Sequence, residues 1–171
     1  SVASTGGSLS LTAGKGGATS YGGNVAIATS RSEQSGAITL NTGESAAQPS
    51  GGISLRTGTS QGSAAGDISL SSGSSTQLSG NVVMEAGAAS TLTGGAVSIS
   101  SGASTTAQAG EILIGTSNGQ TSSGGISLET GSSFDDSGEV KVQASSSNVG
   151  VGGSIAIQTG NGNQRANDIQ M

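Results

Sequence analysis

The sequence has no cysteine, no histidine and only two aromatic side chains, Tyr21 and Phe134. Without cysteine no disulfide can hold the fold together, and without histidine the commonest general base and metal ligand is missing. No apolar run approaches the ~20 residues that a transmembrane helix needs, and no signal-peptide pattern stands at Ser1. We therefore expect no cofactor and no membrane span.

Charge is also scarce. The chain carries ten acidic and five basic residues, a net charge of −5. The basic residues stand far apart in the sequence, so no basic stripe exists that would bind a phosphate backbone. They are Lys15, Arg31, Arg56, Lys141 and Arg165. We expect no nucleic-acid partner.

What the sequence does have is a tandem repeat that reads glycine, any residue, apolar, any residue, apolar. Eleven full copies and a partial twelfth, which opens at Asn167, recur with a mean period of about 14.5 residues. A period this short leaves room for one or two strands with their turns, but not for a helical repeat. The full copies begin at Gly7, Gly23, Gly36, Gly51, Gly66, Gly80, Gly95, Gly110, Gly124, Gly138 and Gly153.

Within each copy, counted from its first glycine as position 0, positions +2 and +4 are apolar and position +6 is small. Because side chains alternate along a strand, these even positions share one face, which we interpret as the core. The predicted core residues at +2 and +4 are Leu9, Leu11, Val25, Ile27, Ile38, Leu40, Ile53, Leu55, Ile68, Leu70, Val82, Met84, Val97, Ile99, Ile112, Ile114, Ile126, Leu128, Val140, Val142, Ile155 and Ile157. The small residues at +6 are Ala13, Thr29, Thr42, Thr57, Ser72, Ala86, Ser101, Thr116, Thr130, Ala144 and Thr159.

The second half of each copy is built from Ser, Thr and Ala, and it is long enough for a second short strand. Position +7 is usually glycine, which we expect to supply the positive φ of a tight corner. The predicted fold is all-β: a parallel β-solenoid (β-helix), a thin two-sheet coil with about 14–15 residues per rung and 11–12 rungs. It spans residues 1–171 as a single repeat array. Because the end rungs lack a capping sequence, we expect a segment of a longer protein or filament.

The composition, with 32 glycines in 171 residues, also fits a flexible or disordered tract with too little apolar surface to offset its ordering entropy. Two features favour the solenoid over this alternative. Charge is low, and apolar and polar residues alternate strictly in stretches such as Ile68-Ser69-Leu70.

The acidic residues give no catalytic or metal-binding pattern. A glycosidase or lyase would need two or three acids clustered on one face, but no two acids fill the same column in adjacent copies. The paired glycines lack the helix that a phosphate-binding loop requires, so we interpret them as corners. We interpret Asp135-Asp136 as a solvated turn. The acids at +1 and +5 are Asp67, Glu111, Glu139, Asp168, Glu85 and Glu129. We predict no catalytic residue, no metal ligand and no enzyme activity.

Threonine columns on a flat solenoid face are typical of insect and grass antifreeze proteins, and the grass proteins resemble this chain in the length of their period. In this chain the threonine-rich column is position +6, which the alternation places inside. For this reason ice binding is not the leading hypothesis. An ice-binding or carbohydrate-binding module that uses a flat, hydroxyl-rich face is kept as the alternative function.

The phrase Gly-Gly-Ile-Ser-Leu-x-Thr-Gly, at Gly51 and again at Gly124, resembles long Gly/Ser/Thr-rich β-solenoid repeat proteins predicted in algae and other protists. The resemblance covers nearly the whole chain and implies a structural role at the cell surface or outside the cell. We therefore predict a segment of an extracellular fibre, appendage or adhesin stalk that assembles into a filament. Its expected partners are other copies of itself or further repeats, end to end, with carbohydrate as a further candidate.

Overall fold

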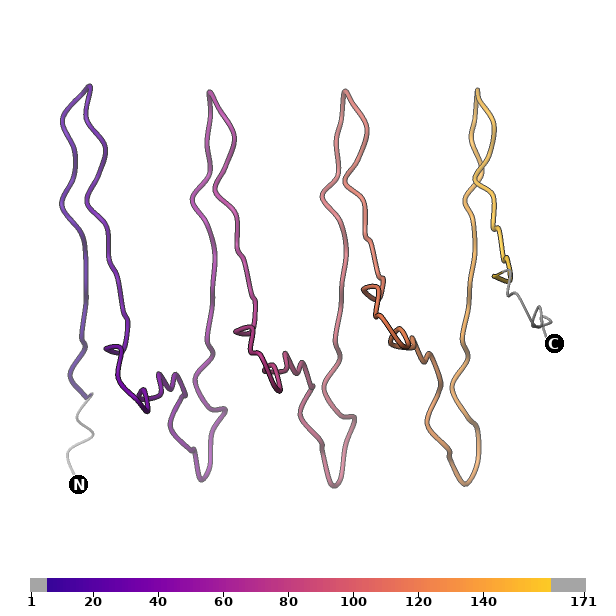
Figure 1. Cartoon of the computed structure of the whole chain (residues 1–171), viewed down its shortest axis with the longest axis horizontal. Coiled ribbons are helices and arrows are strands. Elements are labelled where there is room, and N and C mark those ends of the chain that lie inside the picture. Colours follow the sequence, from indigo (N-terminus) through magenta and orange to yellow (C-terminus); the bar gives the residue numbers. More distant parts are fainter. Residues whose placement is uncertain (1–5, 161–171) are drawn as a thin grey trace. The chain divides into compact units, whose positions relative to one another are not determined.

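The computed structural model describes residues 6–160. Within this range the chain forms no helix and no β-strand: it is extended coil, interrupted at intervals by bends and by a short turn at residues 18–19 (Figure 1). The extended stretches carry the Gly-x-apolar-x-apolar sequence, and the bends fall in the Ser/Thr/Ala-rich second half of each copy. The bends and the turn recur at residues 18–20, 32–34, 46–48, 61–63, 76–77, 90–92, 105–107, 120–121, 134–135 and 148–150.

The predicted parallel β-solenoid is therefore wrong. A solenoid needs each rung to pair its backbone with the rungs above and below, which would join residues about 14–15 positions apart. Between the described residues, every hydrogen bond joins positions no more than nine apart in the sequence. Each repeat thus forms bonds within itself and to the first residue of the next, and no sheet results.

The buried core that this prediction implied is also not seen, because no hydrophobic residue of the described chain is buried. Ile68 is 54% exposed and Leu70 is 74% exposed, so the alternation does not hide one face from water. The 22 residues expected in the core are all between 47% and 86% exposed. They are Leu9, Leu11, Val25, Ile27, Ile38, Leu40, Ile53, Leu55, Ile68, Leu70, Val82, Met84, Val97, Ile99, Ile112, Ile114, Ile126, Leu128, Val140, Val142, Ile155 and Ile157.

The total accessible surface agrees with this picture. The chain exposes 17752 Å², whereas a compact monomer of this mass exposes about 7,400 Å² and a fully unfolded chain about 23,000 Å². Most of the surface that a globular fold removes from water thus stays exposed here.

The glycines at +7 do not act as expected either. No glycine among the described residues has a positive φ, so none supplies the left-handed corner that we predicted. An added Cβ at Gly43, Gly58 or Gly87 would also meet no atom within 4 Å. The structure thus shows no conformational or steric requirement for glycine at these three positions.

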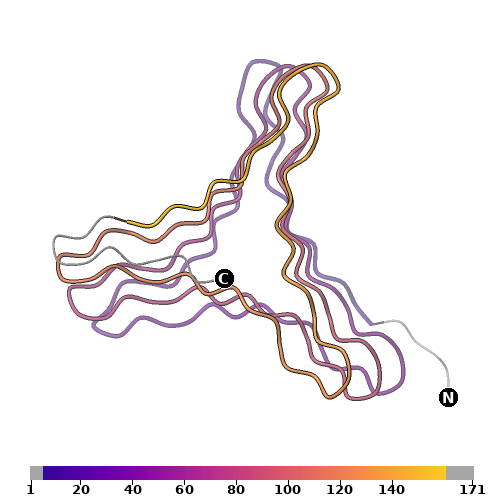
Figure 2. The ribbon, with the colours of Figure 1, turned by 90° about the vertical axis from the view of Figure 1, so that its right-hand side faces the viewer.

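The chain divides into two units, Ser1–Met84 and Glu85–Met171. The first is described from residue 6 and the second through residue 160, and both are built in the same way. In each unit, taken by itself, extended segments alternate with narrow loops in which the chain turns back on itself (Figures 1 and 2). All backbone–backbone hydrogen bonds between residues 6 and 160 form within or across the base of these loops.

Candidate functional site

The recurring structural unit is the neck of each loop. We use this term for the residues at +6 and +7 together with the first glycine of the following copy. In half of the described copies the amide of that glycine donates a hydrogen bond to the carbonyl oxygen at +7, and we call this neck closed. The bonds are Gly23 to Gly14 at 2.8 Å, Gly80 to Gly73 at 3.3 Å, Gly95 to Gly87 at 2.8 Å, Gly110 to Gly102 at 2.9 Å and Gly153 to Ser145 at 2.8 Å.

The closed neck explains why its copy is followed by a glycine. At Gly95 an added Cβ would lie 3.2 Å from the backbone nitrogen of Gly87 and 3.3 Å from the Cβ of Ala86. At Gly153 it would lie 3.2 Å from the Cβ of Ala144. These distances are tighter than ordinary van der Waals contact, so a larger residue would push the two sides of the neck apart.

The other described necks are open, without that backbone bond. Each has threonine at +6, and the Cγ2 methyl of the threonine faces the following glycine. A Cβ on Gly51 would lie 3.6 Å from Cγ2 of Thr42, and one on Gly66 would lie 3.9 Å from Cγ2 of Thr57. The open necks lie at Thr29/Gly36, Thr42/Gly51, Thr57/Gly66, Thr116/Gly124 and Thr130/Gly138.

A serine at +9 shapes the loop beyond the neck, and the sequence analysis did not single it out. The Oγ of Ser104 accepts a 2.9 Å hydrogen bond from the backbone N–H of Ala107, and Ser147 accepts one of 2.9 Å from Gly150. Ser45, Ser60 and Ser75 act in the same way, while Ser32 instead donates to the carbonyl oxygen of Gln34. Such side-chain bonds give a turn its shape without any tertiary contact.

The signal for this serine is visible in the sequence once copies are aligned on their first glycine. Position +9 is serine in seven of the eleven full copies: Ser32, Ser45, Ser60, Ser75, Ser104, Ser133 and Ser147. Three other copies have glycine there, and two of these glycines, Gly16 and Gly119, lie in the described range. An added Cβ at these two would collide with the backbone carbonyls of Tyr21 and Ser122, respectively. The loops that contain Gly16 and Gly119 are thus built differently from the loops that contain the serine turn.

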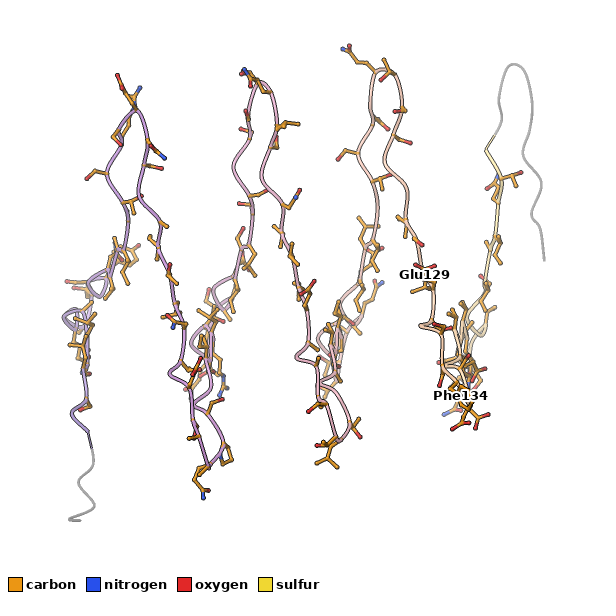
Figure 3. The ribbon with its side chains drawn as sticks, turned by 90° about the horizontal axis from the view of Figure 1, so that it is seen from below. Glu129 and Phe134 are labelled. Atoms are coloured by element: carbon orange, nitrogen blue, oxygen red, sulfur yellow. The ribbon has the colours of Figure 1, made fainter. Side chains whose placement is uncertain are left out.

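The acidic residues of the described range do not gather into a cluster of three or more. No three acidic side chains come together to hold a metal ion anywhere in the described range, and no pocket is found there. Figure 3 shows Glu129 on an extended segment and Phe134, a fully exposed aromatic, at the bend that follows. Asp135 and Asp136 lie next to Phe134, and all three are exposed. Nothing in this region assembles a catalytic constellation.

The main surface feature is instead apolar. Each described copy presents two large aliphatic side chains, at +2 and +4, on an extended backbone whose own N–H and C=O groups between those positions have no hydrogen-bond partner in the described chain. Exposed apolar side chains and unpaired extended backbone both favour contact with another surface. This apolar pair is the candidate functional site of the repeat.

No family model matches the sequence, and neither the curated proteins nor the solved structures include a significant match to it. No helix in residues 6–160 is long and apolar enough to cross a membrane. The assignment of a function therefore depends on the repeat and its exposed surface alone.

Proposed function

We propose that this chain is a structural repeat segment, part of an extracellular fibre, appendage or adhesin stalk, whose copies associate with one another or with further repeats into a filament. The observation that supports it is the exposure of every large apolar side chain in the described range. The proposal assigns the chain no enzyme activity and no cofactor.

The first step of the argument is energetic. Burial of water-exposed aliphatic side chains lowers the free energy by roughly 25 cal/mol per Å² of apolar surface removed from water. The chain does not remove them from water by itself: even Val140, the least exposed of the apolar pairs, is 47% exposed. Burial must therefore come from another molecule or from further repeats.

The second step concerns the partner. Every copy offers the same short apolar pair flanked by small polar residues, so a surface that accepts one copy accepts the others. A second copy of the chain brings the complementary surface in the same number and at the same spacing of about 14.5 residues. Contacts made by one pair are then multiplied along the array, which raises overall affinity without any new kind of contact. A tandem repeat thus favours another copy of itself as its partner.

The test compares two substitutions in neighbouring positions, repeated in several consecutive copies. Leu70→Asp and its equivalents at +4 place a charge in the apolar pair, whereas Ser69→Asp and its equivalents at +3 add the same charge between the pair. Light scattering and electron microscopy of the unmodified chain should show elongated particles that grow with concentration. The +4 substitutions should abolish growth, while the +3 substitutions should reduce it only modestly.

A chain that stays monomeric at every concentration would overturn the proposal. So would equal loss of growth in both sets of variants, because net charge alone would then account for the effect.

The alternative, an ice- or carbohydrate-binding module, has one observation in its favour. The alternation predicted that the threonines at +6 point inward, but Thr42, Thr57 and Thr116 are all exposed. Inhibition of ice recrystallisation, or retention on a polysaccharide matrix, that is lost when these threonines are changed to valine would favour this alternative. Retention of either activity by the valine variants would exclude a role for the hydroxyls.

A further inference from the structure

The ten described necks fall into two classes that follow a single residue. All five closed necks have alanine or serine at +6, and all five open necks have threonine there. The closed set is Ala13, Ser72, Ala86, Ser101 and Ala144, and the open set is Thr29, Thr42, Thr57, Thr116 and Thr130.

Other features of the repeat do not separate the two classes. The copy that begins at Gly80 and the copy that begins at Gly36 both run 15 residues to the next first glycine, yet the first has a closed neck and the second an open one. Position +7 is glycine or serine in both classes: Ser145 lies in a closed neck and Ser117 in an open one. The serine turn at +9 likewise occurs in both, at Ser104 and at Ser60.

The geometry gives a cause. In closed necks, a Cβ on the first glycine would lie 3.2–3.4 Å from the Cβ at +6. In open necks the same separation is 3.8 Å at Thr42, 3.7 Å at Thr116 and 3.6 Å at Thr130, and the threonine Cγ2 is the nearer atom, at 3.5–3.6 Å. A branched Cβ has little freedom to turn its methyl away, because its χ1 rotamers are few. The methyl therefore holds the two sides of the neck a few tenths of an ångström too far apart for the backbone bond.

Burial agrees with this cause in two of the five closed necks, whereas Ser72, Ala86 and Ser101 in the other three are exposed. Three residues in the described range are half-buried. Two of them, Ala13 and Ala144, lie in closed necks. The threonines of the open necks are exposed.

We propose that the side chain at +6 is a positioning residue that sets the state of each neck: alanine or serine closes it, and the threonine methyl keeps it open. Read along the chain from the first copy, the states are closed, three open, three closed, two open and closed. Each open neck leaves a glycine N–H and a +7 carbonyl without a partner in the described chain. This proposal does not depend on the structural function proposed above.

The test uses paired substitutions in the full chain, followed by NMR. The probes are the scalar coupling across the hydrogen bond between the Gly95 nitrogen and the Gly87 carbonyl carbon, and the exchange rate of the Gly95 amide. Ala86→Thr should abolish the coupling and speed exchange roughly two- to tenfold, the factor expected for losing one modest hydrogen bond. Ala86→Ser is the matched control and should keep the coupling.

The reverse change should create a bond. Thr42→Ala should produce a new coupling between the Gly51 nitrogen and the Gly43 carbonyl carbon, and should slow exchange of the Gly51 amide by a similar factor. Thr42→Val keeps the branched methyl but removes the hydroxyl, so this neck should stay open. Retention of the Gly95 coupling in Ala86→Thr would overturn the proposal. A new coupling in Thr42→Val would do so as well, because the hydroxyl rather than the methyl would then control the neck.

Discussion

Gly153 donates a 2.8 Å hydrogen bond to the carbonyl oxygen of Ser145, eight residues earlier in the chain. The acceptor is a backbone atom, so the bond forms although Ser145 is not glycine. The residue type at the donor position is more restricted, because a Cβ on Gly153 would press against Ala144. The two glycine-rich positions thus have different physical meanings in a closed neck: the first glycine is required by a close approach, and a glycine at +7 is not.

This difference leads to the first prediction. Gly95→Ala should break the neck bond to Gly87, because the new Cβ would lie 3.2 Å from the Gly87 nitrogen and 3.3 Å from the Ala86 Cβ. Gly87→Ala should keep the bond, because nothing lies within 4 Å of its Cβ position. Exchange of the amide at position 95 measures both: faster in the first variant and unchanged in the second. Equal exchange in the two would contradict the steric account.

The second prediction concerns the serine turns. Ser104→Ala removes the acceptor of the Ala107 amide, so exchange of that amide should speed up about two- to fivefold, the lower range for an exposed hydrogen bond. Thr105→Ala, at the adjacent exposed position, serves as the control and should leave the rate unchanged. Protection of Ala107 that survives Ser104→Ala would show that the loop holds its shape without the serine.

The third prediction concerns the loops that lack this serine. Gly119→Ala places a Cβ against the carbonyl oxygen of Ser122, so the loop has to change its backbone conformation. NMR chemical shifts should move at several residues around 119–123. Gly125→Ala meets no atom within 4 Å and should shift only its immediate neighbours. Confinement of the Gly119→Ala shifts to the adjacent residues would contradict the close approach.

The fourth prediction concerns the driving force for association. Burial of aliphatic pairs such as Ile68 and Leu70 is a hydrophobic process, which weakens on cooling. Particles formed at room temperature should therefore lose scattering intensity when cooled to just above freezing, and should regain it on warming. Particles that grow on cooling would indicate that polar contacts, and not the apolar pairs, hold the copies together.

The repeat itself could be predicted from the sequence, and the bends recur with the same period in the second half of each copy. The alternation in Ile68-Ser69-Leu70 predicted the secondary structure less well. It shows which side chains would share a face if the strand were paired, but it says nothing about whether pairing is favourable. Two large aliphatic side chains per copy, with only Ala, Ser and Thr to pack against, bury too little apolar surface to offset the ordering of the whole copy. The composition, which fits a flexible tract, agrees better with the extended coil of residues 6–160.

The neck and the serine turn could not be predicted, although the residues that form them are visible in the sequence. Both depend on residues that the sequence displays openly, namely the first glycine, the small residue at +6 and the serine at +9. From the sequence alone, the small residue at +6 predicts packing inside a sheet, because the alternation implies strand geometry for that stretch. The difference between threonine and alanine at that position has meaning only when the following glycine is known to lie against it, and that contact depends on the loop turning back.

The short span of the hydrogen bonds has a mechanical consequence. Since none joins described residues more than nine positions apart, a pulling force on the chain would load each neck separately and release only a few residues when it breaks. A single chain stretched in an optical trap should then lengthen smoothly, as an entropic spring does, without the sawtooth of force peaks that a folded domain gives. If copies associate as proposed, stiffness would come from that association, because the single chain by itself would remain compliant.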